Sequence, residues 1–193
     1  MEQWIMRNCA IAALALIGLA LMALSVSVWS GPAHAGTGGD GILQDRFEYL
    51  SQHGNSNCSR AFMESIASMA PTMRLQGSCC GPMAEHRYRE QVEGLQKYAS
   101  VPLIPADPYD IPAGIAQQAM AWFAVELSAE GQAAYDYAME NSAERGPCCC
   151  KCWRWQVYGG LAKYLIREHD FTDEQVAELW DMSDGCGGDD HVH

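Results

Sequence analysis

The stretch PCCCKCWRWQVYGGLAKYLIREH, residues 147–169, joins the densest group of cysteines in the chain to a long helical pattern. Pro147 suits the first turn of a helix, because its missing N–H leaves no hydrogen bond unmade there. We therefore predict a helix from Cys148 to about His169. Its positive N-terminal end would carry four thiols and favour their thiolate form: Cys148, Cys149, Cys150 and Cys152.

Helical periodicity also dominates the sequence on both sides of this stretch. Ser128 is a plausible N-cap, and Thr172 with Gln175 forms a capping box. Residues 101–112 contain four prolines and predict an irregular connector. No run alternates apolar and polar residues for the length of a strand. The further helices that we expect are Asp45–His53, Ser59–Met73, His86–Tyr98, Ala113–Leu127, Ala129–Glu140 and Asp173–Met182. The sequence thus predicts an all-α fold, a small irregular helical bundle.

The first 35 residues have the layout of a signal peptide. A short segment with Arg7 precedes an apolar run over residues 10–28, and Ala33-His34-Ala35 provides small residues for cleavage. The alternative is a retained membrane anchor, since the run is nearly long enough to span a bilayer. We expect cleavage after Ala35 and export to the periplasm or the extracellular space.

The remaining chain predicts one domain with loose ends. We expect a flexible glycine-rich N-terminus over residues 36–44, a single helical domain over residues 45–186 and a disordered tail over residues 187–193. His191 and His193 in that tail form a His-x-His pair that could bind a divalent ion, although a solvated end explains them as well.

The chain carries a formal net charge of −12, and loss of the leader leaves that value unchanged because the leader has one Glu and one Arg. Nucleic acids and anionic membranes are bound by clusters of Lys and Arg. The charge therefore argues against both as partners. We also expect that the chain is not an integral membrane protein once the leader has been removed.

Eight of the nine cysteines remain after Cys9 is removed with the leader. An even number in an exported chain first suggests disulfides. Cys79-Cys80-Gly81-Pro82 forms a second thiol turn, which either donates metal ligands or is held by disulfides. Cys58, near a helix start, and Cys186, in a glycine-rich segment, look more like disulfide partners than ligands.

The main hypothesis is a soft-metal site in a binding protein. Thiolates select soft ions, so Cu(I) is the first candidate and zinc or mercury follow. If the first residues after Pro147 are not helical, Cys148 and Cys150 form a Cys-x-Cys chelate instead. A metal-transfer or redox protein is the expected partner. The predicted core ligands are Cys148, Cys150 and Cys152, and the further ligands are Cys149, Cys79 and Cys80.

Two alternatives stay open. Cys149 and Cys152 form a Cys-x-x-Cys pair that a thiol–disulfide oxidoreductase would use. Four disulfides would instead make a stapled structural or interaction module. The sequence has no Ser/His/Asp pattern, no phosphate-cradling glycine loop and no His-Glu-x-x-His. It therefore favours a binding protein over an enzyme.

The segment that contains the four clustered cysteines matches a known sequence motif. The segment from Pro147 to Cys152 fits the pattern P-C-x-C-x-C, with Cys148 and Cys150 in the first two cysteine positions. The preceding helical segment contributes Tyr135, Tyr137, Ala138 and Glu140. In these features residues 113–186 resemble exported bacterial proteins named for a PCYCGC motif, with Cys149 in place of the tyrosine and Lys151 in place of the glycine. The resemblance implies export and metal or thiol chemistry, and no particular reaction.

Overall fold

The computed structural model describes residues 38–188. The predicted signal peptide and the His191/His193 pair lie outside this range. Within it, the fold is mainly helical, as the sequence predicts, and two short strands are added.

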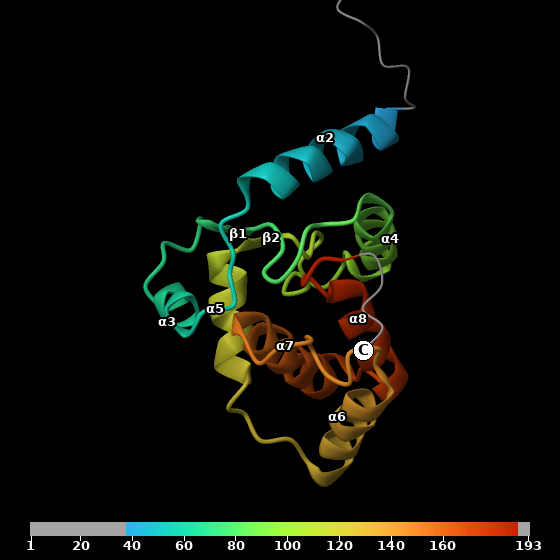
Figure 1. Cartoon of the computed structure of the whole chain (residues 1–193). Helices are drawn as coiled ribbons and strands as arrows, with labels where there is room; N and C mark the ends of the chain where they lie inside the picture. Colours follow the sequence, from blue (N-terminus) through green and yellow to red (C-terminus); the bar gives the residue numbers. More distant parts are fainter. Residues whose placement is uncertain (1–37, 189–193) are drawn as a thin grey trace, which may run out of the picture. The chain divides into compact units, whose positions relative to one another are not determined.

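Helix α7 (Trp153–His169) is buried along most of its length. Val157, Leu161 and Leu165 recur at helical spacing and are fully buried. Helix α5 (Ala113–Trp122) packs directly against α7 (Figure 1). This close approach depends on Gly160, because a Cβ there would overlap the carbonyl oxygen of Ala119. α5 ends five residues before the predicted boundary.

Helices α6 (Ala129–Asn141) and α8 (Asp173–Ser183) complete the C-terminal half, and α6 packs on both α7 and α8. Both begin at the predicted caps. The Ser128 hydroxyl accepts a hydrogen bond from the amide of Gly131 at 3.1 Å. Thr172 and Gln175 form the reciprocal capping box.

Helix α3 (Arg60–Ile66) is shorter than the predicted Ser59–Met73. The chain turns after Ile66, and the carbonyl oxygens of Pro71 and Met73 accept hydrogen bonds from the amides of Gly114 and Ala113. Tertiary pairing with the start of α5 therefore replaces the last helical turns.

Helix α2 (Gly38–His53) packs on α4 (Glu85–Leu95), which ends in the 3-10 turn Gln96–Tyr98. The sequence predicts a flexible segment over residues 36–44, whereas the structure has the first turns of α2 from Gly38 onward. Arg89 of α4 explains the difference. Its guanidinium donates to the carbonyl oxygen of Asp40 and to the Gln44 side chain.

Two three-residue strands interrupt the helical pattern. β1 (Arg74–Gln76) pairs antiparallel with β2 (Asp110–Pro112), and Leu75 lies opposite Ile111. Leu75 and Ile111 are both buried. Three residues are too few to show the alternation of apolar and polar side chains that identifies a strand in a sequence. For this reason the sequence does not reveal β2, which lies inside the stretch that we predicted as an irregular connector.

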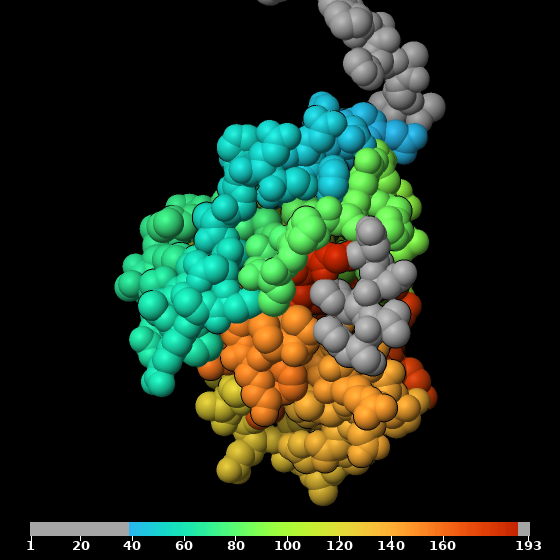
Figure 2. Space-filling model, viewed as in Figure 1, coloured from blue at the N-terminus to red at the C-terminus, as the bar shows by residue number. Residues whose placement is uncertain are grey.

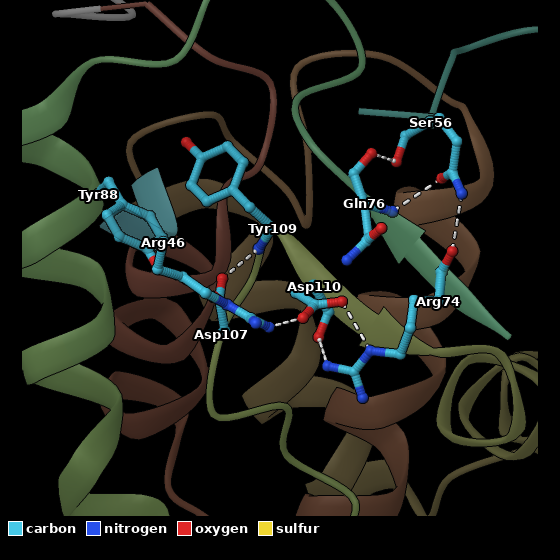
Figure 3. A network of polar contacts seen from close by, with 9 residues as sticks. Arg46, Ser56, Arg74, Gln76, Tyr88, Asp107, Tyr109 and Asp110 are labelled. Atoms are coloured by element: carbon cyan, nitrogen blue, oxygen red, sulfur yellow. Dashed lines mark hydrogen bonds and ion pairs between the residues drawn. The ribbon is translucent and has the colours of Figure 1, made fainter. Parts of the chain in front are cut away.

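A polar network fastens α2 to these strands (Figure 3). The buried carboxylate of Asp110 pairs with Arg46 of α2 on one side and with Arg74 of β1 on the other. Arg74 Nε lies 2.6 Å from Asp110 Oδ1. The network fixes the strand from which the Cys79-Cys80 turn departs.

No helix within residues 38–188 combines the length and the apolar character needed to cross a membrane.

Candidate metal centre

Three loops meet beside the N-terminal end of α7. They follow β1, precede α7 and follow α8, and they comprise residues 77–82, 146–152 and 184–188. The first and third run side by side through main-chain hydrogen bonds. The amide of Gly81 donates to the carbonyl oxygen of Cys186 at 2.8 Å, and the amide of Gly188 donates to that of Pro82 at 2.7 Å. The corresponding green, orange and red segments lie close together in Figure 2.

Glycines permit this close pairing. Gly187 has a φ of +85° and Gly77 a φ of +75°, in the left-handed region that disfavours other residues. A Cβ on Gly187 would also lie 2.7 Å from the carbonyl oxygen of Pro82. The glycine-rich segment around Cys186 therefore brings that thiol against the other loops.

All eight cysteines of the described residues fall into one contiguous group, the cysteine cluster. Cys80 Sγ lies 3.8 Å from Cys150 Sγ and 3.9 Å from Cys149 Sγ, so the two predicted thiol turns touch. Cys186 Sγ lies 3.0 Å from Cys148 Sγ and 2.9 Å from Cys149 Sγ. Cys58 contacts Cys80 at 3.1 Å and Cys150 at 3.4 Å between sulfur atoms. The two other members are Cys79, which lies 3.7 Å from Cys80, and Cys152, which lies 3.9 Å from Cys148.

The solvent exposure of the cysteines differs across the cluster. Cys80 is exposed, whereas Cys148, Cys152 and Cys186 are buried. The other four thiols are half-buried: Cys58, Cys79, Cys149 and Cys150. An ion can therefore reach the outer sulfurs directly and still be surrounded by protein on the inner side.

The helical start predicted at Cys148 is wrong. Residues 148–152 form turns and bends, Cys152 is the N-cap, and α7 begins at Trp153. Cys148 and Cys150 instead contact thiols of loops far away in sequence. A helix turns about 100° per residue and would point three consecutive thiols in different directions. The non-helical conformation lets them converge, and it includes the predicted alternative in which Cys148 and Cys150 share one site.

The structure brings all six predicted ligand residues into the cluster, and it adds two that sequence reasoning set aside. Cys58 and Cys186 were expected to be disulfide partners, yet both are free thiols among the others. For Cys186 the signal was present in the glycines on either side. Cys58 offered no comparable signal, since its position depends on contacts with loops far away in sequence.

Arg154 supplies a buried positive charge next to the cluster. Its guanidinium donates to the carbonyl oxygens of Pro108 at 2.5 Å and Gly77 at 3.0 Å, and it lies over the Trp153 ring. Gly185 makes room for it, because a Cβ there would overlap the guanidinium. Burial alone would lower the pKa of Arg154, but electrostatic interactions with Tyr158, Cys79 and Cys148 raise it, so the side chain stays charged.

The thiols influence one another's ionisation strongly. Hydrogen bonds from Cys148, Cys152 and Cys186 lower the pKa of Cys79. Burial raises the pKa of Cys80, Cys149 and Cys150. A cation that binds these thiols displaces the protons that they carry.

The sulfur spacing fits metal coordination. Tetrahedral coordination with metal–sulfur bonds of about 2.3 Å separates the sulfurs by about 3.8 Å. Four contacts in the cluster measure 3.7–3.9 Å: Cys79–Cys80, Cys80–Cys149, Cys80–Cys150 and Cys148–Cys152. The contacts of 2.9–3.4 Å are too long for disulfides, whose sulfurs lie about 2.05 Å apart, and are shorter than the tetrahedral spacing. The clustered cysteines can thus hold a metal ion.

The two cysteines of the predicted redox pair have different sulfur neighbours. Cys149 contacts Cys186 and Cys80, and Cys152 contacts Cys148. The cysteines of the Cys-x-x-Cys sequence therefore face different neighbours, which does not favour an oxidoreductase centred on them.

Comparison with family models, with curated proteins and with solved structures finds no match to this chain. The function is therefore inferred from the residues of the cysteine cluster and their geometry.

Proposed function

We propose that this chain is an exported soft-metal-binding protein, which holds Cu(I) in the cysteine cluster for trafficking, storage or detoxification. The observation that carries the proposal is the convergence of eight thiols from four separate segments. Thiolates that lie so close together repel one another unless a cation compensates for their charge.

The donor set supports a soft ion. The four candidate ligand groups in the described residues consist of cysteine alone, with no histidine or carboxylate among them. Thiolate sites select Cu(I) and zinc, whereas oxygen ligands suit Mg²⁺ and Ca²⁺. The predicted signal peptide supports export, and the exposed Cys80 supports exchange of the ion with a metal-transfer protein.

Competition against a Cu(I) chelator under anaerobic conditions tests the proposal. We expect the purified protein to withdraw Cu(I) from the chelator, and a Cys148→Ser/Cys150→Ser/Cys152→Ser variant to withdraw less of it. Only Cys80, Cys149 and Cys186 then remain together as three members of one candidate ligand group. Met73→Leu provides a matched control, because it removes an exposed sulfur outside the cluster and should bind like the unaltered protein.

A free-thiol count on protein recovered from the exported compartment supplies the contrary outcome. Pairs such as Cys58–Cys80 and Cys148–Cys186 are near enough to be oxidised after small movements. Four disulfides and no bound metal would refute the proposal in favour of a stapled module.

A further inference from the structure

We infer that the cysteine cluster is a polynuclear centre, which binds at least two Cu(I) ions at once and joins them through shared sulfurs. This inference rests on the proposed function and adds the number and arrangement of the ions.

Two ligand groups in the cluster have no member in common. One comprises Cys80, Cys149, Cys150 and Cys186, and the other comprises Cys58, Cys79 and Cys152. Within each group all sulfurs lie within 4.8 Å of one another. Each group alone therefore offers the three or four sulfurs that complete the coordination of a soft ion. Two ions can be held without competing for a ligand.

The two groups are also in contact. Cys58 of the second group lies 3.1 Å from Cys80 and 3.4 Å from Cys150 of the first, measured between sulfur atoms. Cys79 lies 3.7 Å from Cys80. A thiolate at this boundary can donate to an ion on either side. Cys148 reaches Cys186 of one group and Cys152 of the other, so it provides a further bridge.

Charge favours more than one ion. Each thiol that binds Cu(I) forms a sulfur–copper bond and releases one proton to solvent. A single monovalent ion would compensate for only one thiolate, and surplus negative charge is costly where Cys148, Cys152 and Cys186 are buried. Arg154 compensates for one more charge. Additional Cu(I) ions bound through shared thiolates bring the centre closer to neutrality.

Native mass spectrometry of the protein loaded with Cu(I) under anaerobic conditions gives the stoichiometry. We expect two or more ions per chain in the unaltered protein. A Cys79→Ser/Cys152→Ser variant leaves the second group one sulfur and also breaks the groups Cys79/Cys148/Cys186 and Cys148/Cys150/Cys152, so it should hold at least one ion fewer than the unaltered protein. X-ray absorption should show copper–copper scattering in the unaltered protein if sulfurs are shared.

The outcomes separate this inference from the proposed function. One tightly bound ion per chain would overturn the polynuclear centre and leave soft-metal binding intact, whereas no bound ion would refute both. Two ions without copper–copper scattering would overturn the shared sulfurs. Circular dichroism confirms that a variant is folded. If the double variant is not, Cys80→Ser/Cys149→Ser replaces it, since it alters exposed and half-buried positions of the first group and should also reduce the stoichiometry.

Discussion

At the scale of single residues, Gly160 determines how closely α5 approaches α7. Alanine at this position would place its Cβ onto the carbonyl oxygen of Ala119 and 2.8 Å from the amide nitrogen of Phe123. Both atoms are main chain, so neither can rotate away. We expect Gly160→Ala to lower the free energy of unfolding by about 3 kcal/mol, measured by urea denaturation.

Gly41→Ala is the matched control for that substitution. Gly41 lies in α2, and a Cβ there has no neighbour within 4 Å. Alanine should leave stability unchanged or raise it by roughly 0.5–1 kcal/mol through helix propensity. Equal destabilisation by both substitutions would contradict the assigned contact between α5 and α7.

Residue types identified much of the candidate site in advance. The cysteine runs at 79–80 and 148–152 drew attention because thiols so close in sequence can share a metal. Cys58 stands alone in the sequence, and only the folded chain brings it 3.1 Å from Cys80. Residue type and spacing can indicate candidate ligands, but they do not show which isolated cysteine joins a site in the folded chain.

At the scale of elements, Asp110 joins α2 to the two strands. Its buried carboxylate compensates for Arg46 and Arg74, whose side chains are each 42% exposed. Asparagine would leave the two guanidiniums near each other with Asp107, 3.5 Å from Arg46 Nε, as the countercharge that remains. Solvent screens part of this repulsion, so we expect Asp110→Asn to cost roughly 2 kcal/mol of stability.

Hydrogen exchange would locate this effect. Amides of α2 and β1 should lose protection in Asp110→Asn, while those of α7 change little. Glu64→Gln serves as the control, because it removes an exposed ion pair with Arg60 inside α3 and should change neither stability nor exchange. Unaltered protection of α2 in Asp110→Asn would show that apolar contacts alone hold that helix.

Local sequence signals predicted some helix boundaries correctly and missed others. The caps at Ser128 and Thr172 set correct helix starts, because a side chain there satisfies main-chain amides only a few residues away. The start of α7 and the end of α3 were missed, because loops and strands far away in sequence decide them. The strand pair was missed for the same reason, since Leu75 finds Ile111 only in the folded chain.

At the scale of the whole molecule, the centre should exist only in the folded chain. Its ligands come from the segments before α3, after β1, before α7 and after α8. The fold class follows from helical periodicity, which is local. The assembly of the centre depends on long-range contacts, which no spacing in the sequence reveals.

Because the ligands come together only in the folded chain, metal binding should stabilise the folded state. An ion that binds the folded chain better than the unfolded one stabilises it by RT ln(1 + [L]/Kd). At a free Cu(I) concentration about a thousandfold above the dissociation constant, we expect a gain of about 4 kcal/mol, measured by urea denaturation under anaerobic conditions. The Cys148→Ser/Cys150→Ser/Cys152→Ser variant should gain less, because it has fewer sulfurs in the cluster, and Mg²⁺, which prefers oxygen ligands, should give no gain.

The same measurement separates a folded centre from local chelation. The run Cys148-Cys149-Cys150-Lys151-Cys152 carries four thiols within five residues and could bind Cu(I) in an unfolded chain. In that case both states would bind the ion, and the unfolding midpoint would not change. A large shift instead requires ligands that only folding brings together. Cys186→Ser should then reduce the shift although it leaves the run untouched, because Cys186 contacts both Cys148 and Cys149 in the folded chain.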